Sequence, residues 1–419
     1  MNTLRPTSFY RIAAICLLPA YAIHALLRAN KDGGRRYFKE RFGVFSKDSQ
    51  PRTWIHTASV GEVLTAQPLI KALLEKHPDR YFLITTNTPT GYGRVKTTLI
   101  DHYPDQIIHR YLPIDVGFST QRMFKQHTIK ESYVVETELW PWLYAQAATN
   151  QTPITIINAR LTAKTLKASK GLLGSAYRRA LGAVRVLARS ATDAANYNQI
   201  GVQHQRITTI GDLKFADNRS GDERKLIDMP YCIAASTHPD EELQLARAWL
   251  TRQSDQLLVI APRHVERGEQ LHKSLTELCQ DLNMSGSTLV NDLRSDGAIP
   301  SPDSKLYLAD TLGELASWYA FAQAAFVGGS LVDRGGHNVL EPMFANCPIV
   351  VGPHTKNFPD AVAMLEQQNA IEKCANAEDV VDFLQTMALN PDQRQIKKAA
   401  LKQAALSIDQ ILVRYLDHM

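Results

Sequence analysis

The chain has 419 residues, which is more than one hydrophobic core usually supports, so we expect two globular domains. Its 44% apolar and 21% charged residues are typical of a folded protein and exclude disordered and collagen-like classes. The five cysteines are widely spaced, odd in number and without a Cys-x-x-Cys pair, which excludes a disulfide framework and favours a reducing, cytoplasmic compartment.

The first element along the chain is an apolar segment, Ile12–Leu27. Its sixteen residues are fewer than the roughly 20 that a membrane-spanning helix needs, and Pro19 and His24 lie within it. A cleaved signal peptide is the alternative, but the segment runs directly into Arg28 and lacks a small-residue cleavage site. We therefore expect residues 1–30 to be a retained N-terminal membrane anchor that lies in, or barely crosses, an anionic membrane.

Two basic runs stand out against the modest net charge of +5. Residues 28–41 carry six basic and two acidic side chains, and residues 160–189 carry eight basic and no acidic side chains. Each run fits either a solvated face or attraction to anionic headgroups or a phosphorylated lipid, where one basic residue contributes about 1 kcal/mol. We expect no nucleic-acid partner, because no DNA- or RNA-reading motif occurs.

Beyond the anchor, short β-rich runs alternate with amphipathic helical stretches. The expected strands are 53–56, 81–87, 132–138, 154–161, 231–236, 256–262, 305–310, 324–330 and 348–353. The clearest expected helices are 62–76, 240–252 and 392–416. Several strands are nearly continuous in Val, Ile and Leu, as in parallel sheets buried on both faces.

This alternation predicts two doubly wound α/β domains. We expect an N-terminal domain over residues 31–212 and a C-terminal domain over residues 213–419, with the boundary in the polar stretch 212–230. Ligands of such domains bind beyond the carboxyl ends of the strands, so the residues that follow each strand are the ones to examine for chemistry.

Acidic residues follow two expected strands of the first domain. Glu62 lies in the first turn of the helix after strand 53–56, where it is either a carboxylate that the helix dipole stabilises or a catalytic base. Glu136 and Glu138 end the expected strand 132–138 and would point the same way if the strand persists. Their structural alternative is to face a helix N-terminus or to pair with Arg160.

The second domain offers two anion-binding patterns. Arg263 follows strand 256–262 and can hold a phosphate or carboxylate, or form a surface ion pair. In the block 326–342, two glycine pairs lead into a helix that we expect near Asn338, which makes an anion site of backbone N–H groups and places Glu341 to bind ribose hydroxyls. The dinucleotide fingerprint G-x-G-x-x-G is not matched, which argues against a dehydrogenase.

Several catalytic motifs are missing from the sequence. It contains no Asp-x-Asp, which bridges the metal ion of many sugar-nucleotide enzymes, no H-E-x-x-H and no G-x-S-x-G. The thirteen histidines are scattered, so we expect no metal site.

Taken together, ten blocks in order along nearly the whole chain resemble the 3-deoxy-D-manno-octulosonate (Kdo) transferases of lipopolysaccharide inner-core assembly. The blocks are ASVGE (58–62), TPTG (88–91), ETELWP (136–141), NARL (158–161), GDLKF (211–215), STH (236–238), PRHVER (262–267), DTLGEL (310–315), FVGGSLVDRGGHNVLEP (326–342) and GPHTKNF (352–358). Each block alone is common, whereas the combination is specific to that family.

The resemblance implies a GT-B fold, in which two Rossmann-like domains face each other across a cleft. It further implies an inverting, metal-independent transfer of Kdo from CMP-Kdo to the lipid A precursor lipid IVA, without a cofactor, at the cytoplasmic face of the inner membrane. Two alternatives stay open. One is another GT-B nucleotide-sugar transferase or an epimerase, and the other is a membrane-tethered protein that binds its ligand without turnover.

The resemblance also implies roles for individual residues. Glu62 looks like the general base, and Glu136 and Lys214 look like the residues that support the transition state. The positions that look like the CMP-binding ones are Pro262, Arg263, Leu312, Gly313, Glu314, Asn338, Val339, Leu340 and Glu341. Asp212 stands where a serine is often seen, and we expect it to influence the orientation of Lys214.

Overall fold

The computed structural model describes residues 5–217, 223–252, 255–286, 288–290 and 293–419. The chain divides into two compact units, the first comprising Met1–Asp217 with Gln410–Met419 and the second Asn218–Asp409. This division falls inside the polar stretch 212–230, of which residues 218–222 lie outside the described residues.

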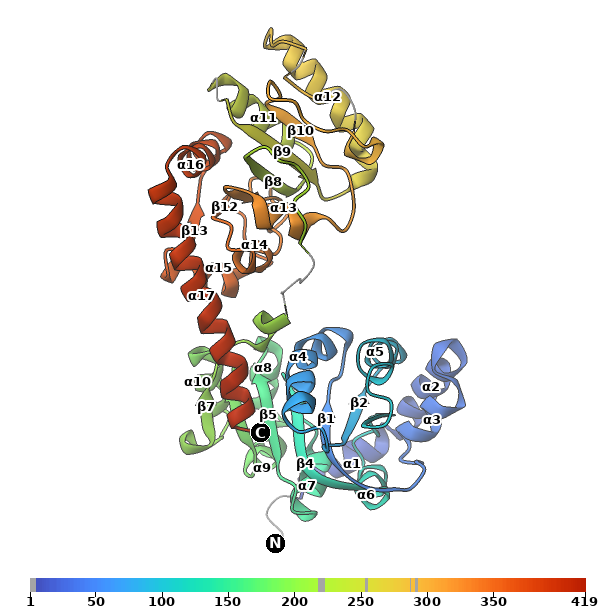
Figure 1. The fold of residues 1–419 in the computed structure, drawn as a ribbon. Helices are drawn as coiled ribbons and strands as arrows, with labels where there is room; N and C mark the ends of the chain where they lie inside the picture. Colours follow the sequence, from blue (N-terminus) through green and yellow to red (C-terminus); the bar gives the residue numbers. More distant parts are fainter. Residues whose placement is uncertain (1–4, 218–222, 253–254, 287, 291–292) are drawn as a thin grey trace. The chain divides into compact units, whose positions relative to one another are not determined.

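The first unit is built on a parallel sheet whose strand order is β3-β2-β1-β4-β5-β6-β7. Its strands are β1 (Asp48–His56), β2 (Phe82–Thr86), β3 (Ile107–Tyr111), β4 (His127–Val135), β5 (Ile154–Ala159), β6 (Arg185–Ala188) and β7 (Ile207–Thr209). All pairs are parallel; for example, Ile55 of β1 is in register with Tyr133 of β4. The central strands are buried because helices cover both faces (Figure 1).

The helices of the first unit enclose two apolar clusters, one on each face of the sheet. They are α1 (Ser8–Cys16), α2 (Leu18–Arg28), α3 (Gly34–Arg41), α4 (Val60–Lys76), α5 (Pro89–Val95), α6 (Gly117–Gln126), α7 (Pro141–Thr149), α8 (Ala163–Ser169), α9 (Gly174–Leu181) and α10 (Ala191–Gln199). Short π and 3-10 turns join them: η1 (Ala29–Gly33), η2 (Lys96–Ile100), η3 (His204–Arg206) and η4 (Leu213–Asp217). Pro141 begins α7, at a position where proline is well tolerated.

The second unit repeats this plan on a smaller parallel sheet of order β10-β9-β8-β11-β12-β13. The strands are β8 (Tyr231–Thr237), β9 (Leu257–Pro262), β10 (Leu306–Leu308), β11 (Ala325–Val327), β12 (Ile349–Val351) and β13 (Ile371–Lys373). The helices are α11 (Glu241–Thr251), η5 (Val265–Arg267), α12 (Gly268–Asp281), η6 (Arg294–Asp296), α13 (Leu315–Phe321), α14 (Leu340–Phe344), α15 (Pro359–Gln367) and α16 (Ala377–Leu389). Both units are therefore doubly wound α/β folds, as the sequence predicts.

The last helix, α17 (Pro391–Asp417), ends in the first unit, although the sequence analysis placed residues 213–419 together. The reason is the packing of its final turns. The buried Tyr415 hydroxyl accepts a hydrogen bond from the Asn158 backbone N–H (3.2 Å) and donates one to the Gly211 carbonyl (3.1 Å). Gly211 has a φ of +130°, and a Cβ there would lie 2.6 Å from Ile411, so glycine lets this helix approach closely.

The expected anchor segment forms two helices. The chain breaks at Leu17, between α1 and α2, and Pro19 lies in the first turn of α2, where proline is tolerated. Among the described residues, no single helix combines the length and apolar composition needed to cross a membrane, whereas the pair Ser8–Cys16 and Leu18–Arg41, bent by 47°, meets both criteria together.

One face of this segment packs on the first unit. The Tyr10 hydroxyl donates a 2.7 Å hydrogen bond to the buried Asp115 carboxylate, which also accepts from the backbone N–H groups that begin α7. Ala14 packs against Ile114 and Val116. The other face exposes seven large apolar side chains, each 50–64% accessible: Phe9, Ile12, Ile15, Leu17, Ile23, Leu26 and Leu27.

Candidate active site

Both sheets have one position where the strand order reverses direction. In the first unit it lies between β1 and β4, and in the second between β8 and β11. At such a switch point, the loops that follow the two strands run to opposite faces of the sheet. This creates a crevice between the loops, where doubly wound folds bind ligands. The residues that follow these four strands are therefore the first candidates for function.

Glu62 lies after β1, in the first turn of α4. The Ser59 side chain caps this helix by accepting from the Glu62 N–H (3.4 Å), and the Glu62 carboxylate turns back to accept from the Ala58 N–H (2.6 Å) and the Ser59 hydroxyl (3.3 Å). This reciprocal arrangement resembles a capping box. It holds the carboxylate at the carboxyl edge of the sheet in one orientation.

The electrostatic environment of Glu62 is unfavourable for its charged form. Burial, together with the charges of Glu138 and Glu136, raises its pKa to about 8 against the opposing effect of the Ala58 N–H. In this state Glu62 is largely protonated at neutral pH. A carboxyl group with a pKa near the working pH is well matched to proton transfer, because it both accepts and releases a proton readily.

Glu136 follows β4 and forms ion pairs with two basic side chains. Its Oε1 lies 2.7 Å from Lys214 Nζ, and its Oε2 lies 3.7 Å from Arg160 Nη1. Glu136 has a left-handed φ of +59°, which costs energy for a residue with a side chain and recurs at functional positions. The Asp212 carboxylate accepts from the Lys214 N–H (3.0 Å), so Asp212 fixes the turn that carries Lys214.

Glu138 points to a different set of partners. The strand ends at Val135, so the alternation that would have aligned the carboxylates of Glu136 and Glu138 does not reach them. Glu138 Oε2 accepts from the Trp140 indole (2.5 Å) and lies 3.8 Å from Nε2 of the fully buried His56. Nothing in the sequence singled out His56, because a buried histidine at the end of a strand resembles an ordinary core residue.

In the second unit, three of the expected nucleotide-binding residues lie close together. Arg263 directly follows Pro262, the last residue of β9, and its N–H donates to the Thr237 carbonyl (2.9 Å). The Asn338 amide donates to Glu341 (3.0 Å). Burial raises the pKa of Glu341, which the Asn338 hydrogen bond and the Arg263 charge partly offset.

The helix expected near Asn338 starts slightly later, at Leu340, with Val339 as its N-cap residue. The Asn338 side chain accepts from the Leu340 N–H (3.1 Å). Asparagine is suited to this position because its side chain bonds the backbone two residues on.

The expected site positions 312–314 form an exposed turn. Leu312 is 76% accessible and Gly313 has a φ of +82°. The Glu314 carboxylate, in contrast, is occupied within the protein. It accepts two hydrogen bonds from Arg294 (3.1 and 3.2 Å) and one from Thr311 (2.5 Å), and the Arg294 contact holds its pKa below the usual value.

The glycine-rich loop after β11 differs from its expected role. The backbone N–H groups of Gly329, Ser330 and Leu331 donate to the fully buried Glu241 carboxylate at 2.7, 3.0 and 2.9 Å. A carboxylate of the chain itself therefore fills the nest that we had expected to hold a ligand anion. The sequence contains only a weak sign of this contact. Glu241 lies in the first turn of α11, and acids are common there because the helix dipole stabilises them.

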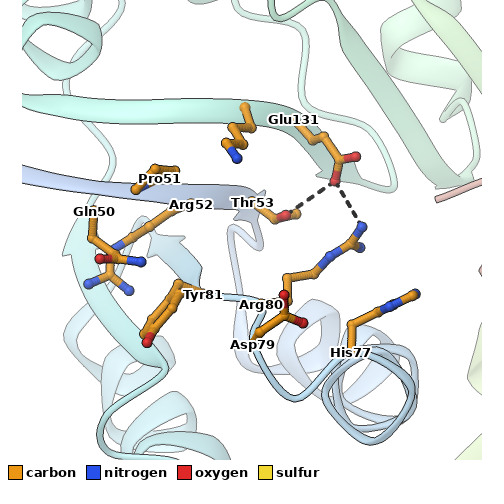
Figure 2. A pocket seen from close by; sticks show the side chains of 10 residues that line it. Gln50, Pro51, Arg52, Thr53, His77, Asp79, Arg80, Tyr81 and Glu131 are labelled. Carbon is orange, nitrogen blue, oxygen red and sulfur yellow. Dashed lines mark hydrogen bonds and ion pairs between the residues drawn. The ribbon is translucent and has the colours of Figure 1, made fainter.

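A separate pocket of about 340 Å³ opens near the other end of the first sheet (Figure 2). It is lined by the early part of β1 and β4 and by the turn before β2. Glu131 accepts from the Thr53 hydroxyl (3.2 Å) and pairs with Arg80 (3.5 Å) there. Because these residues precede the carboxyl ends of their strands, the pocket is distinct from the switch-point site.

Within the described ranges, no three His, Cys, Asp or Glu side chains form a group that could hold a metal ion.

Comparison with known proteins identifies the family. A family model described as 3-deoxy-D-manno-octulosonic-acid transferase (kdotransferase) matches residues 36–217. The 3-deoxy-D-manno-octulosonic acid transferase of Haemophilus influenzae is 32% identical over 88% of this chain and 87% of its own. That of Bordetella pertussis is 31% identical over 94% of both chains.

The fold has a solved relative of low sequence identity. A glycosyltransferase from Rickettsia africae superposes with a TM-score of 0.50 at 12% identity, over 89% of this chain and 98% of that one. It supports a GT-B type architecture of two Rossmann-like units. Since relatives above 30% identity match nearly the full length, the chain belongs to the 3-deoxy-D-manno-octulosonic acid (Kdo) transferase family and is a glycosyltransferase.

Proposed function

We propose that this enzyme transfers Kdo from CMP-Kdo to the lipid A precursor lipid IVA, by an inverting displacement that needs no metal ion. The observation that carries the proposal is the grouping of Glu62, Glu136 and Lys214 at the switch point of the first sheet. One carboxyl group there has a pKa near 8, and a lysine–glutamate pair of 2.7 Å accompanies it.

In the proposed step, the Glu62 carboxylate accepts the proton of the acceptor hydroxyl. The acceptor oxygen forms a bond to the anomeric carbon of Kdo while the bond from that carbon to the phosphate oxygen breaks, and CMP leaves with the electron pair. A single displacement inverts the anomeric carbon and requires one base. The raised pKa makes Glu62 a stronger base than an exposed glutamate.

Lys214 supplies positive charge to this reaction. Its ammonium group is held by Glu136 and its backbone by Asp212, so its position is set before substrate binds. Preorganised charge stabilises the negative charge that develops on the departing phosphate and costs no reorganisation during the reaction. Arg160, 3.7 Å from Glu136, adds to the positive field.

Residues of the second unit are proposed to hold the CMP group. Arg263 is exposed and suits a phosphate or the sugar carboxylate, and Glu341 suits the ribose hydroxyls. Leu312 and Gly313 offer the backbone groups of an exposed turn to the nucleotide. The Glu314 carboxylate is already bound by Arg294, so its proposed role is to hold this turn in place.

The lipid acceptor and the cytoplasmic face of the inner membrane are proposed from the N-terminal segment and the basic runs. α1, α2 and the residue between them, Leu17, expose seven large apolar side chains on the face that does not pack on the first unit. Leu172, 78% accessible, lies within the acid-free basic run 160–189. Apolar side chains beside basic ones suit the interface of an anionic bilayer and a phosphorylated glycolipid.

The experiment is to incubate the purified protein with CMP-Kdo and lipid IVA, with and without EDTA, and to follow the lipid by mass spectrometry. We expect the lipid to gain Kdo and one CMP to be released per sugar added, equally in both conditions. Loss of transfer in EDTA that added metal restores would overturn metal independence. Turnover of a UDP-sugar in place of CMP-Kdo would favour a different GT-B transferase or an epimerase.

A further inference from the structure

Two histidines face each other at the switch point of the second sheet. His238 is the first residue after β8, and His337 lies in the loop after β11. Their Nε2 atoms are 2.8 Å apart, and the two rings meet edge to edge in nearly the same plane, with an interplanar angle of 6° and centroids 5.1 Å apart. Two imidazole nitrogens at this distance share one proton, so one ring donates and the other accepts.

The backbone around the pair is fixed. Glu241 accepts from the His238 N–H (2.9 Å) as well as from the loop that follows β11, so it ties the two strand ends together. Gly329, with a φ of +69°, lies under both rings, since a Cβ there would be 3.2 Å from His337 and 3.4 Å from His238. The Gly336 N–H donates to the Gly329 carbonyl (2.7 Å) and holds His337 in place.

The surroundings of the pair are strongly basic. The His264 ring lies 5.8 Å from His238, and the charges of Arg334 and Arg267 act on His238. Burial lowers the pKa of His238, with these cations adding to the effect and Glu241 opposing it. Glu241 is the acid that faces the pair, and its oxygens already accept backbone N–H groups.

The partner histidine shows the same effect more strongly. Burial is the main cause that lowers the pKa of His337 to about 4, and the charges of His238, Arg263 and His264 contribute to that shift. The pair is therefore neutral at pH 7, and it lies in a cationic surrounding at the edge where ligands of this fold bind. An anion bound at this edge would offset the cationic field and allow the pair to take up a proton.

We propose that His238 and His337 form an oxyanion subsite that takes up one proton when the acidic group of the donor nucleotide binds. The added proton goes to the free Nδ1 of the donating ring, so the N–H···N bond between the rings persists and one ring becomes an imidazolium. This inference rests on the proposed CMP-Kdo donor. The nucleotide phosphate and the sugar carboxylate share the required chemistry.

The test is calorimetric titration of the full-length protein at pH 7 in two buffers of different ionisation enthalpy. The ligands are CMP, cytidine and free Kdo, and the proteins are wild type, His238→Gln, His337→Gln and the exposed control His204→Gln. Glutamine keeps a hydrogen-bonding side chain but does not titrate. The CMP phosphate itself titrates near pH 6, so the readout is the proton number of wild type minus that of the variant.

We expect the wild type to take up more protons with CMP than either glutamine variant, by a number approaching one, and the variants to bind CMP about tenfold more weakly. Cytidine should bind without proton uptake, and uptake with free Kdo instead of CMP would assign the subsite to the carboxylate. Equal proton numbers in wild type and variants that keep wild-type thermal stability would overturn the subsite. If the wild type does not bind CMP at all, the proposed donor is wrong instead.

Discussion

Glu138→Gln tests whether the acidic residues around Glu62 tune its basicity. The substitution removes a negative charge that raises the pKa of Glu62. Without that charge the Glu62 carboxylate forms more easily, so its pKa should fall. Because the base works only as the carboxylate, kcat/KM of the free enzyme should then begin to decline at a lower pH than in the wild type.

The size of the change follows from the pKa of Glu62. With a pKa of about 8, roughly 1% of Glu62 is a carboxylate at pH 6, and kcat/KM falls about tenfold for each pH unit below 8. One nearby like charge shifts a pKa by about one unit. Glu138→Gln should therefore shift the acidic limb of the pH profile, where kcat/KM declines, down by about one pH unit. This shift does not depend on how the substitution changes the maximal kcat/KM.

The assay is kcat/KM for the acceptor from pH 5 to pH 9. The matched control is Glu131→Gln, which removes the same charge from the middle of β4, at the separate pocket of Figure 2, and should leave the limb in place. An acidic limb near pH 4.5 in the wild type would refute the raised pKa of Glu62. Equal limbs in the wild type and Glu138→Gln would refute the role of the neighbouring charge.

Three further predictions concern Lys214, Glu241 and Tyr10. Lys214→Ala removes the partner 2.7 Å from Glu136 and should lower kcat about 100-fold in steady-state kinetics, with little change in CMP affinity; an unchanged kcat contradicts its role. Glu241→Gln places an amide against several backbone donors and should destabilise the second unit by about 3 kcal/mol in urea unfolding, so a wild-type unfolding curve contradicts the nest. Tyr10→Phe removes the 2.7 Å donor to Asp115 and should speed proteolysis within α1 severalfold, whereas wild-type protection would show that this bond does not hold the segment.

The buried strands were the most predictable part of the fold. Nine runs of apolar residues coincide with strands of the two sheets, because burial on both faces demands nearly continuous Val, Ile and Leu. The sequence analysis did not identify β3, β6, β7 and β13. The sequences of β3 and β6 include His109, Arg110 and Arg185, and β7 and β13 each contain a single apolar residue, so their patterns are weak.

The residues of the site were easier to name than their contacts. Motifs predicted Glu62, Glu136 and Lys214 as site residues, but the ion pair between the last two joins positions 78 residues apart and depends on how the sheet brings strand ends together. Spacing alone suggested that Glu136 and Glu138 point the same way. The left-handed backbone at Glu136 separates them, and no local pattern announces that conformation.

The glycine loop shows the opposite limit. Its sequence correctly indicated backbone N–H groups aimed at an anion, but not which anion. Glu241, 88 residues before Gly329, supplies the carboxylate from within the chain. A nest of N–H groups stabilises any carboxylate or phosphate, so only the three-dimensional structure identifies its occupant.

Glu62→Gln is the measurement that tests the proposed mechanism most directly. Glutamine keeps the size of the side chain and can still accept from the Ala58 N–H, but it does not accept the proton of the acceptor. The control, Glu75→Gln, changes an exposed acid at the other end of α4. We predict about 10³-fold slower Kdo transfer with CMP binding unchanged in Glu62→Gln, and wild-type activity in the control. Transfer by Glu62→Gln at the wild-type rate would contradict the mechanism.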